Sequence, residues 1–231
     1  MNKNNLFKSI ENSFVYDVAV KTPLNKLSTL SDKLNNSIYL KREDLQPVHS
    51  FKLRGAYQKI ASLQKKSKQL NIIAASAGNH AQGVAYSAMK LKLKATIVMP
   101  QTTPDIKVEA VKTLGATVIL HGDSYDDAYN KAKELSTQSQ ATFIHPYDDI
   151  DVIAGQGTIA KEILDELDNI DFIVIPVGGG GLLAGLASYI KHKKPQISII
   201  AVEPENSNCF HQARLHNKPV KLDTVGIFAD G

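Results

Sequence analysis

Residues 171–185 read DFIVIPVGGGGLLAG: an apolar run is followed by four consecutive glycines and then by a helical pattern. The apolar run has the β-branched composition of a buried strand, and glycines permit the tight turn that must follow it. A strand that leads through such a loop into a helix is the repeating unit of folds with parallel sheets. The stretch therefore predicts an α/β protein.

The same alternation continues outward through most of the chain. Apolar runs predict strands at residues 37–41, 71–75, 95–99, 116–120, 141–144, 171–177 and 197–202. Apolar residues at helical spacing predict helices at residues 51–70, 79–91, 104–114, 124–136, 150–167 and 182–192. The strand runs are continuously apolar, which is typical of strands covered on both faces. Regular β-α alternation predicts right-handed crossovers and a mostly parallel sheet.

The composition narrows the class of protein. The 231 residues are 43% hydrophobic, and 27 Lys+Arg against 23 Asp+Glu give a net charge of +4, which argues against a disordered chain. No apolar run approaches the ~20 residues that span a bilayer, so no membrane partner is expected. Basic residues are scattered and lack interleaved aromatics, so no nucleic-acid partner is expected either. The single cysteine, Cys209, is typical of a reducing compartment and favours a cytoplasmic location.

The glycine loop predicts an anion site. It consists of Gly178, Gly179, Gly180 and Gly181. Because these residues lack Cβ atoms, several backbone N–H groups can turn toward one point, where the positive end of the following helix adds to them. The loop is therefore suited to a phosphate group.

One interpretation of this phosphate is a dinucleotide. Gly179-x-Gly181-x-x-Ala184 matches the fingerprint of nicotinamide- and flavin-dependent oxidoreductases. Glu203 ends the next strand, 24 residues after Gly179, where a ribose-binding carboxylate is expected. Two features argue against this interpretation: such a fingerprint normally opens its domain, and it leaves the other polar loops of the chain without a role.

A second loop, SAGNH at residues 76–80, directly follows the strand at residues 71–75. Small residues at a strand-to-helix turn expose backbone N–H groups that can bind a carboxylate. Asn79 is a candidate either for the helix cap or for a ligand contact, and His80, at the start of a helix, is more often structural.

A third loop, SFKLRGA at residues 50–56, places Lys52 in the first turn of a helix. The helix dipole disfavours a cation there and lowers the pKa of the amine, and burial lowers it further. A neutral amine is the nucleophile that forms a Schiff base. By position alone, a solvated lysine is the favoured interpretation.

Together these loops resemble a known family. Residues 41–57, KREDLQPVHSFKLRGAY, resemble the Schiff-base lysine motif of fold-type II pyridoxal-phosphate enzymes, and the closest resemblance is to biosynthetic threonine dehydratases (threonine ammonia-lyases). Residues 76–80 resemble the substrate loop of that family, residues 176–182 its phosphate loop, and residues 225–231, VGIFADG, a further segment of the threonine dehydratases. The resemblance covers essentially the whole chain in order.

The resemblance implies a role for each loop. Lys52 would bind pyridoxal 5′-phosphate as a Schiff base and later remove the substrate α-proton, and Phe51 would pack against the cofactor ring. Asn79 would hydrogen-bond the 3′-oxygen of the cofactor. Its phosphate would be bound by Gly178, Gly179, Gly180, Gly181 and the Leu182 N–H. The substrate carboxylate would be bound by Ser76, Ala77, Gly78, Asn79 and His80.

The resemblance also implies a tryptophan synthase β-like fold with two three-layer α/β/α domains. A large cofactor domain would comprise residues 1–54 plus 153–231, and a small domain would comprise residues 55–152. The family's catalytic core continues past a point equivalent to residue 231, and it supplies a partner for the pyridine nitrogen there. We therefore expect a large domain that is incomplete at its C-terminus, the absence of the C-terminal regulatory domain, and a homo-oligomer for the intact family enzyme.

The activity implied is elimination of ammonia from L-threonine, giving 2-oxobutanoate for isoleucine biosynthesis, and from L-serine, giving pyruvate. Related serine racemases have a serine at the position of Ala77 that serves as a second proton donor, so Ala77 favours a dehydratase over a racemase. A fragment that is inactive or depends on a partner remains the main alternative. No metal site is expected, because the seven histidines lack metal-ligand spacing. Cys209 has no nucleophile's partner and is read as structural, and Glu203 as a strand-end surface carboxylate.

Overall fold

The computed structural model describes residues 3–67, 69–222 and 225–226. Its helices are α1 (Lys3–Glu11), α2 (Ser28–Lys33), α3 (Lys52–Gln64), α4 (Asn79–Leu91), α5 (Asp105–Thr113), α6 (Tyr125–Ser139), α7 (Ile150–Glu166), α8 (Gly181–Lys193) and α9 (Cys209–His216). Its strands are β1 (Leu24–Lys26), β2 (Tyr39–Lys41), β3 (Asn71–Ala75), β4 (Lys94–Met99), β5 (Thr117–Leu120), β6 (Thr142–Phe143), β7 (Phe172–Pro176) and β8 (Ser198–Val202). Short 3-10 helices are η1 (Val15–Asp17), η2 (Glu43–Leu45) and η3 (Glu205–Ser207).

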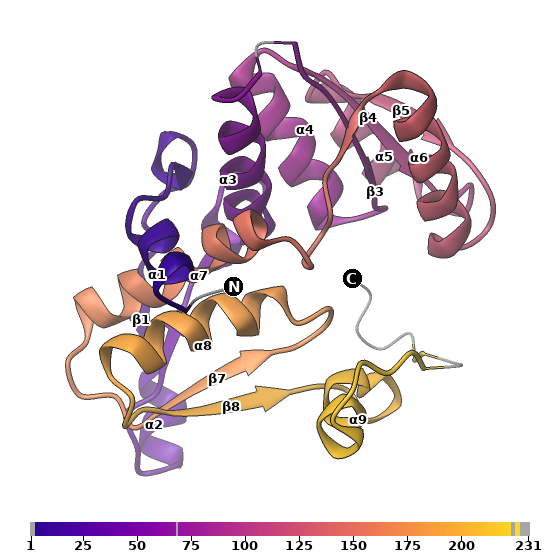
Figure 1. The fold of residues 1–231 in the computed structure, drawn as a ribbon. Coiled ribbons are helices and arrows are strands. Elements are labelled where there is room, and N and C mark those ends of the chain that lie inside the picture. Colours follow the sequence, from indigo (N-terminus) through magenta and orange to yellow (C-terminus); the bar gives the residue numbers. More distant parts are fainter. Residues whose placement is uncertain (1–2, 68, 223–224, 227–231) are drawn as a thin grey trace.

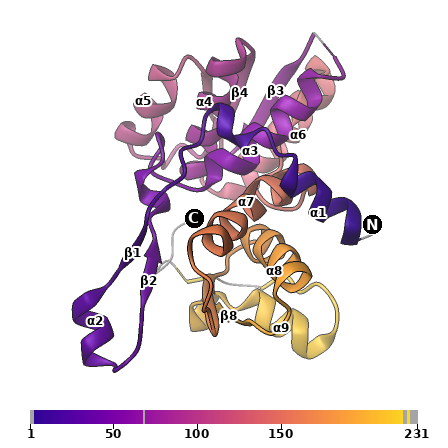
Figure 2. The same cartoon turned by 90° about the vertical axis from the view of Figure 1, so that its left-hand side faces the viewer.

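The predicted α/β class and parallel pairing are confirmed. Strands β5-β4-β3-β6 form one parallel sheet and β7-β8 a second, whereas β1 and β2 pair antiparallel. The four-stranded sheet lies in the upper part of Figure 1, and β7-β8 lies in the lower part with α8 and α9. Helix α7 contacts both α3 and α8, so it connects the two parts. In Figure 2, the β1-α2-β2 arm projects away from the body of the molecule.

The four-stranded sheet is covered on both faces, as its apolar strands predict. Alternate side chains of a strand point to opposite faces, so Ile72 and Ala74 of β3 pack with α4 and α5, while Ile73 and Ala75 pack against α6. Ala128 of α6 is completely buried there. This part of the molecule is a three-layer α/β/α arrangement.

The two-stranded sheet departs from the same prediction. Ile175 of β7 is buried with α1, α7 and α8. On β7, however, Phe172 and Val174 are each 62% exposed, and Ile200 and Val202 of β8 are also exposed. The prediction that both faces are covered was therefore wrong for β7 and β8, because none of the described residues forms a layer over one face of their sheet.

Element boundaries differ most where polar residues replace the apolar pattern. The helix predicted for residues 51–70 ends at Gln64, before the run Lys65-Lys66-Ser67, and the strand predicted for residues 37–41 is limited to Tyr39–Lys41. The N-terminal elements α1, β1 and α2 were not predicted. No helix in the described part of the chain combines the length and apolar character required to cross a membrane.

Candidate functional site

Lys52 is the first residue of α3, as predicted, and its backbone is held from two sides. The Ser50 Oγ accepts a hydrogen bond from the Lys52 N–H at 3.2 Å. Helix α4 lies against the carbonyl of Lys52 so closely that a Cβ on Gly83 would be 3.1 Å from that oxygen. Glycine at position 83 thus allows α4 to approach the start of α3, which fixes the origin of the lysine side chain.

The Lys52 amine is withdrawn from solvent. Burial lowers its pKa below the usual range of a lysine. Its Nζ donates a hydrogen bond to the Pro146 carbonyl at 3.3 Å and lies 5.5 Å from the centre of the Phe51 ring. No carboxylate among the described residues forms an ion pair with it, so desolvation is not compensated by an anion. Such an amine has a raised neutral fraction and can act as a nucleophile or a base.

The glycine loop lies at the N-terminus of α8. Gly180 is the N-cap residue, with a left-handed φ of +83°, and no side chain caps the helix. The first N–H groups of an α-helix have no partner within the helix, so those of Gly181 and Leu182 are available to an external acceptor. The structure thus has a feature suited to an anion at the position that the sequence predicts.

A segment that the sequence analysis did not select joins these two features. The carbonyl of Pro146 accepts the hydrogen bond from Lys52, and the next residue, Tyr147, packs on the glycine loop. A Cβ on Gly179 would lie 2.3 Å from the Tyr147 ring, and one on Gly181 would lie 2.7 Å from the Tyr147 carbonyl oxygen. Two consecutive residues therefore bring the amine and the glycine loop into one site. No sequence signal besides the polar composition of residues 145–149 pointed to them.

The loop at residues 76–80 forms the predicted strand-to-helix turn. The Ser76 Oγ accepts a hydrogen bond from the Gly78 N–H at 3.1 Å, and Gly78 is the N-cap of α4 without a side-chain cap. Ala77 is half-buried and Asn79 is exposed, so the Asn79 side chain is accessible. It does not cap the helix, which removes one of the two roles considered for it.

His80 is structural in this arrangement, as its position predicted. It is 3% exposed, and its Nε2 donates to the Ile144 carbonyl at 3.0 Å, which ties α4 to the end of β6. Burial lowers its pKa to about 3, and the nearby Lys52 cation also lowers it. The ring is neutral near pH 7, and its Nδ1 is buried without a hydrogen-bond partner.

Two other candidates have local structural roles. The Glu203 carboxylate accepts hydrogen bonds from the N–H groups of Phe210 at 2.9 Å and His211 at 2.8 Å, at the start of α9. It is therefore a cap for α9 rather than a free surface group. Burial raises the pKa of the Cys209 thiol, which makes it a poor nucleophile. Among residues 3–67, 69–222 and 225–226, no group of three or more His, Cys, Asp or Glu could hold a metal ion.

Comparison with known proteins places this geometry in context. A family model described as "Pyridoxal-phosphate dependent enzyme" matches residues 15–231. An L-threonine dehydratase biosynthetic IlvA of Pasteurella multocida is 55% identical over 97% of this chain. A chloroplastic threonine dehydratase 1 biosynthetic of Solanum lycopersicum is 55% identical over 96% of it. The structure of processed threonine deaminase isoform 2 of Solanum lycopersicum superposes on the whole chain with a TM-score of 0.96 at 46% identity.

The matches cover only part of each relative. The chain spans 44% of the Pasteurella protein, 37% of the tomato dehydratase and 64% of the tomato deaminase structure. The resemblance inferred from residues 41–57, 76–80 and 176–182 is confirmed by these matches. Residues 227–231 of the fourth segment lie outside the described residues.

Proposed function

Because the chain belongs to the pyridoxal-phosphate dependent enzymes, we propose that it binds pyridoxal 5′-phosphate between Lys52 and the glycine loop. The observation that carries the proposal is the link through Pro146 and Tyr147. It joins a buried amine of lowered pKa to a helix N-terminus with free N–H groups. The aldehyde of the cofactor requires such an amine, and its phosphate requires such N–H groups. The residues present therefore fit both ends of this cofactor.

We assign the cofactor contacts as follows. The phosphate would be bound by Gly178, Gly179, Gly180, Gly181 and Leu182. Lys52 would hold the aldehyde carbon, Phe51 would lie against the ring, and Asn79 would donate to the ring oxygen. The exposed position of the Asn79 side chain and the 5.5 Å separation of Lys52 from the Phe51 ring support these assignments.

The reaction we propose is elimination of ammonia from L-threonine to give 2-oxobutanoate, the first step of isoleucine biosynthesis, with L-serine giving pyruvate. When bound, pyridoxal phosphate supplies an electron sink for the charge left by α-proton removal. The substrate carboxylate would be bound by Ser76, Ala77, Gly78, Asn79 and His80. Lys52, whose pKa is lowered by burial, would take the α-proton. The names of the relatives support this substrate, although the chain spans less than half of their length.

The decisive experiment is covalent trapping. Purified chain is mixed with pyridoxal 5′-phosphate, reduced with borohydride and mapped by mass spectrometry, with release of 2-oxobutanoate from L-threonine measured in parallel. We expect one pyridoxyl group on Lys52 and none in Lys52→Ala. Lys112→Ala, which removes an exposed lysine, is the matched control and should label normally. Labelling spread over exposed lysines with Lys52 unmodified would refute the proposal.

Two alternatives lose support. An oxidoreductase would need Glu203 for a ribose, but that carboxylate already accepts the Phe210 and His211 N–H groups. A racemase would need a proton donor at Ala77, which has none, so Ala77→Ser is expected to introduce formation of D-serine from L-serine. Failure of the trapped chain to release 2-oxobutanoate would favour a cofactor-binding fragment that needs a partner chain.

We also propose a domain division, an oligomeric state and a cellular location for the protein. The division into a domain of residues 1–54 plus 153–231 and a domain of residues 55–152 is supported by the separate sheets β7-β8 and β5-β4-β3-β6. A homo-oligomer and a cytoplasmic location remain proposals that light scattering and cell fractionation can test.

A further inference from the structure

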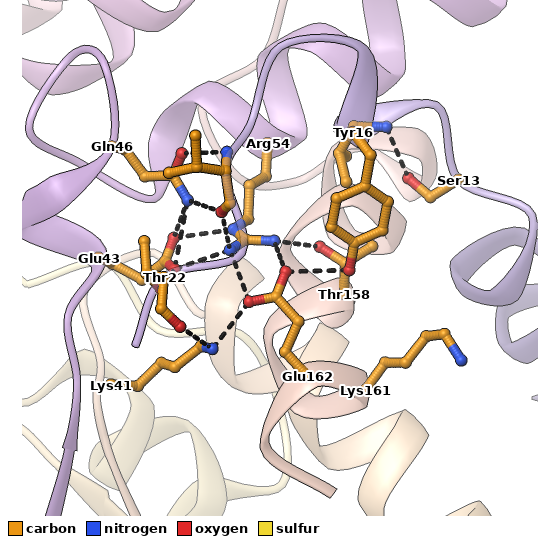
Figure 3. Close-up of polar contacts among 12 residues, drawn as sticks. Ser13, Tyr16, Thr22, Lys41, Glu43, Gln46, Arg54, Thr158, Lys161 and Glu162 are labelled. Atoms are coloured by element: carbon orange, nitrogen blue, oxygen red, sulfur yellow. Dashed lines mark hydrogen bonds and ion pairs between the residues drawn. The ribbon is translucent and has the colours of Figure 1, made fainter. Parts of the chain in front are cut away.

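Four charged side chains with little exposure to solvent form a cluster beside α3 (Figure 3). It comprises Arg54 on α3, Lys41 on β2, Glu43 on η2 and Glu162 on α7. Their side chains are 0%, 8%, 13% and 2% exposed. Each charge in the cluster is paired with an opposite charge, and Lys41 also contacts the exposed Glu166 at 3.2 Å, which is the condition under which buried charges are tolerated.

Arg54 is the centre of the cluster. Its Nε and Nη2 donate to the two oxygens of Glu43, both at 2.8 Å. Its Nη1 and Nη2 donate to the two oxygens of Glu162, at 2.6 and 3.1 Å, and Nη1 also donates to the Thr158 hydroxyl at 3.0 Å. A guanidinium between two carboxylates has one permitted orientation, because both forks must match at once.

Further side chains contact the two carboxylates that bind Arg54. The Lys41 Nζ lies 2.8 Å from the second oxygen of Glu162, and the Tyr16 hydroxyl donates to the first at 2.9 Å. The Gln46 amide donates to Glu43 and to the Val20 carbonyl. The guanidinium is thus held by side chains from η2 and α7, and side chains from η1 and β2 in turn hold Glu162.

The position of Arg54 relative to Lys52 gives the cluster a functional meaning. Successive helical residues are rotated by 100°, so residues two apart project about 200° from each other around the axis. Arg54 faces η2 and α7, whereas Lys52 faces Pro146. Holding Arg54 in one orientation therefore fixes the rotation of the first turn of α3, and with it the direction of Lys52.

The packing of α3 on α7 makes this rotation specific. The Gly55 N–H donates to the Gln156 side chain at 3.2 Å, and a Cβ on Gly155 would lie 2.5 Å from the Arg54 carbonyl oxygen. The helices meet backbone to backbone, so a small rotation of α3 would create a collision. Because the two backbones are in close contact, the orientation of Arg54 also determines the positions of the neighbouring residues of α3.

We propose that Arg54, held by Glu43 and Glu162, is a positioning residue that aims the Lys52 amine at the cofactor site. The inference rests on the proposed function, in which Lys52 carries the cofactor. Arg54 acts through the helix rather than by its charge: only burial lowers the pKa of Lys52, and the charge of Arg54 is paired within the cluster.

The test separates aiming from simple stabilisation by a charge-balanced double variant, Arg54→Met with Glu162→Met. It removes one cation and one carboxylate, so the net charge is unchanged, while Lys41 keeps Glu166 and Glu43 keeps the hydrogen bonds from Thr22 and Gln46. Similar apolar volume replaces the ion pair, so we expect a thermal midpoint within about 4 °C of wild type. The rate of Lys52 modification by pyridoxal 5′-phosphate, trapped with borohydride, should fall about tenfold or more, because a displaced nucleophile loses its attack geometry. Modification of exposed Lys112 in the same sample should not change.

Arg54→Lys is the second variant and keeps the charge but not the fork. Lysines are methylated reductively with 13C-formaldehyde, and the Lys52 signal is followed through a pH titration without cofactor. We expect the Lys52 signal to shift and its midpoint to rise toward that of a solvated lysine, since a misdirected amine regains solvent. Burial and, to a smaller extent, the Lys52 cation lower the pKa of His80 and His145, so their ring signals should be followed in the same titration.

The outcomes are distinct. Wild-type rate and an unchanged Lys52 signal in both variants would overturn the inference and leave Arg54 a purely stabilising residue. If the double variant does not fold, the titration of Arg54→Lys decides alone. If wild-type Lys52 fails to react with pyridoxal 5′-phosphate while its signal still shifts in Arg54→Lys, the proposed function fails and the positioning role stands.

Discussion

Helices α6 and α8 each follow a strand of a parallel sheet, but their starts have opposite chemistry. At α6, the Ser124 side chain accepts from the Asp127 N–H at 3.2 Å, and the Asp127 carboxylate accepts from the Ser124 N–H at 3.0 Å. At α8, the cap is Gly180, which has no side chain to offer. The chain therefore satisfies helix donors with its own side chains at α6, whereas no side chain does so at α8.

The difference shows how a helix start becomes a binding site. Both starts have the positive end of a helix dipole, so the dipole does not distinguish them. What distinguishes them is that the chain withholds a cap at α8 and packs Tyr147 beneath the glycines. The anion site that we propose at α8 thus depends on the lack of a capping side chain, and Tyr147, from a segment distant in sequence, packs against its glycines.

The largest effect is expected from filling the space under the glycine loop. In Gly179→Val the new side chain would overlap the Tyr147 ring, which lies 2.3 Å from the Cβ position. Affinity for pyridoxal 5′-phosphate should fall about tenfold or more. A fluorescence titration measures the affinity, and circular dichroism controls for folding. The substitution Tyr147→Ala should reduce cofactor affinity less in the Gly179→Val background than in wild type. Strictly additive losses of affinity would contradict the contact between the two residues.

A matched pair separates backbone strain from ligand binding. Gly180 and Gly115 share a φ of +83°, and a Cβ on either would meet no atom within 4 Å. Gly180→Ala and Gly115→Ala should each lower the free energy of unfolding by about 1 kcal/mol, measured by urea denaturation. Only Gly180→Ala should also weaken cofactor binding. Equal affinity in the two variants would show that the start of α8 is not the phosphate site.

Removing the cap at α6 should affect stability alone. Ser124→Ala removes the acceptor for the Asp127 N–H and should cost about 1 kcal/mol of unfolding free energy. Cofactor affinity should be that of wild type, since α6 satisfies its own donors. A loss of affinity together with stability would mean that the two helix starts are coupled, and the comparison between them would lose its force.

The smallest expected effect concerns the pKa of Asp127 in the cap of α6. The cap of α8 is Gly180, which has no side chain to titrate. Hydrogen bonds from the Ser124 side chain and from the backbone lower the pKa of Asp127 below its usual 3.8. A carboxyl group of lowered folded pKa contributes stability above the unfolded value, and this is lost as pH falls through the folded value. An NMR titration should record the low pKa, and Ser124→Ala should raise it. An unchanged value would exclude the capping box in solution.

Local features were predictable from sequence because their causes are local. Ser124 followed by acidic residues predicted the start of α6, and the glycines predicted the turn into α8. The strand runs and the parallel pairing followed from hydrophobic pattern. The exposed face of the β7-β8 sheet could not be predicted in this way. An apolar composition indicates that a strand requires burial, but it does not say which segment packs over the strand.

The structure of the site was less predictable. Lys52 and the glycine loop were selected individually, yet from position alone a solvated lysine was the stronger interpretation. Pro146 and Tyr147 join them through contacts that no short pattern encodes. Arg54 was quoted within its motif without a role, since its partner Glu162 lies 108 residues away. Such residues become visible only when distant segments are placed together.

These separations have a consequence for how the chain acquires its chemistry. The contact between Lys52 and Pro146 spans 94 residues, and the ion pair of Arg54 with Glu162 spans 108. Closing loops of that length is slow and entropically costly, so such contacts form after the local helices. We therefore expect the Lys52 amine to reach its final environment only late in folding. Appearance of a Lys52 that reacts with an aldehyde would serve as a clock for the last stage of folding.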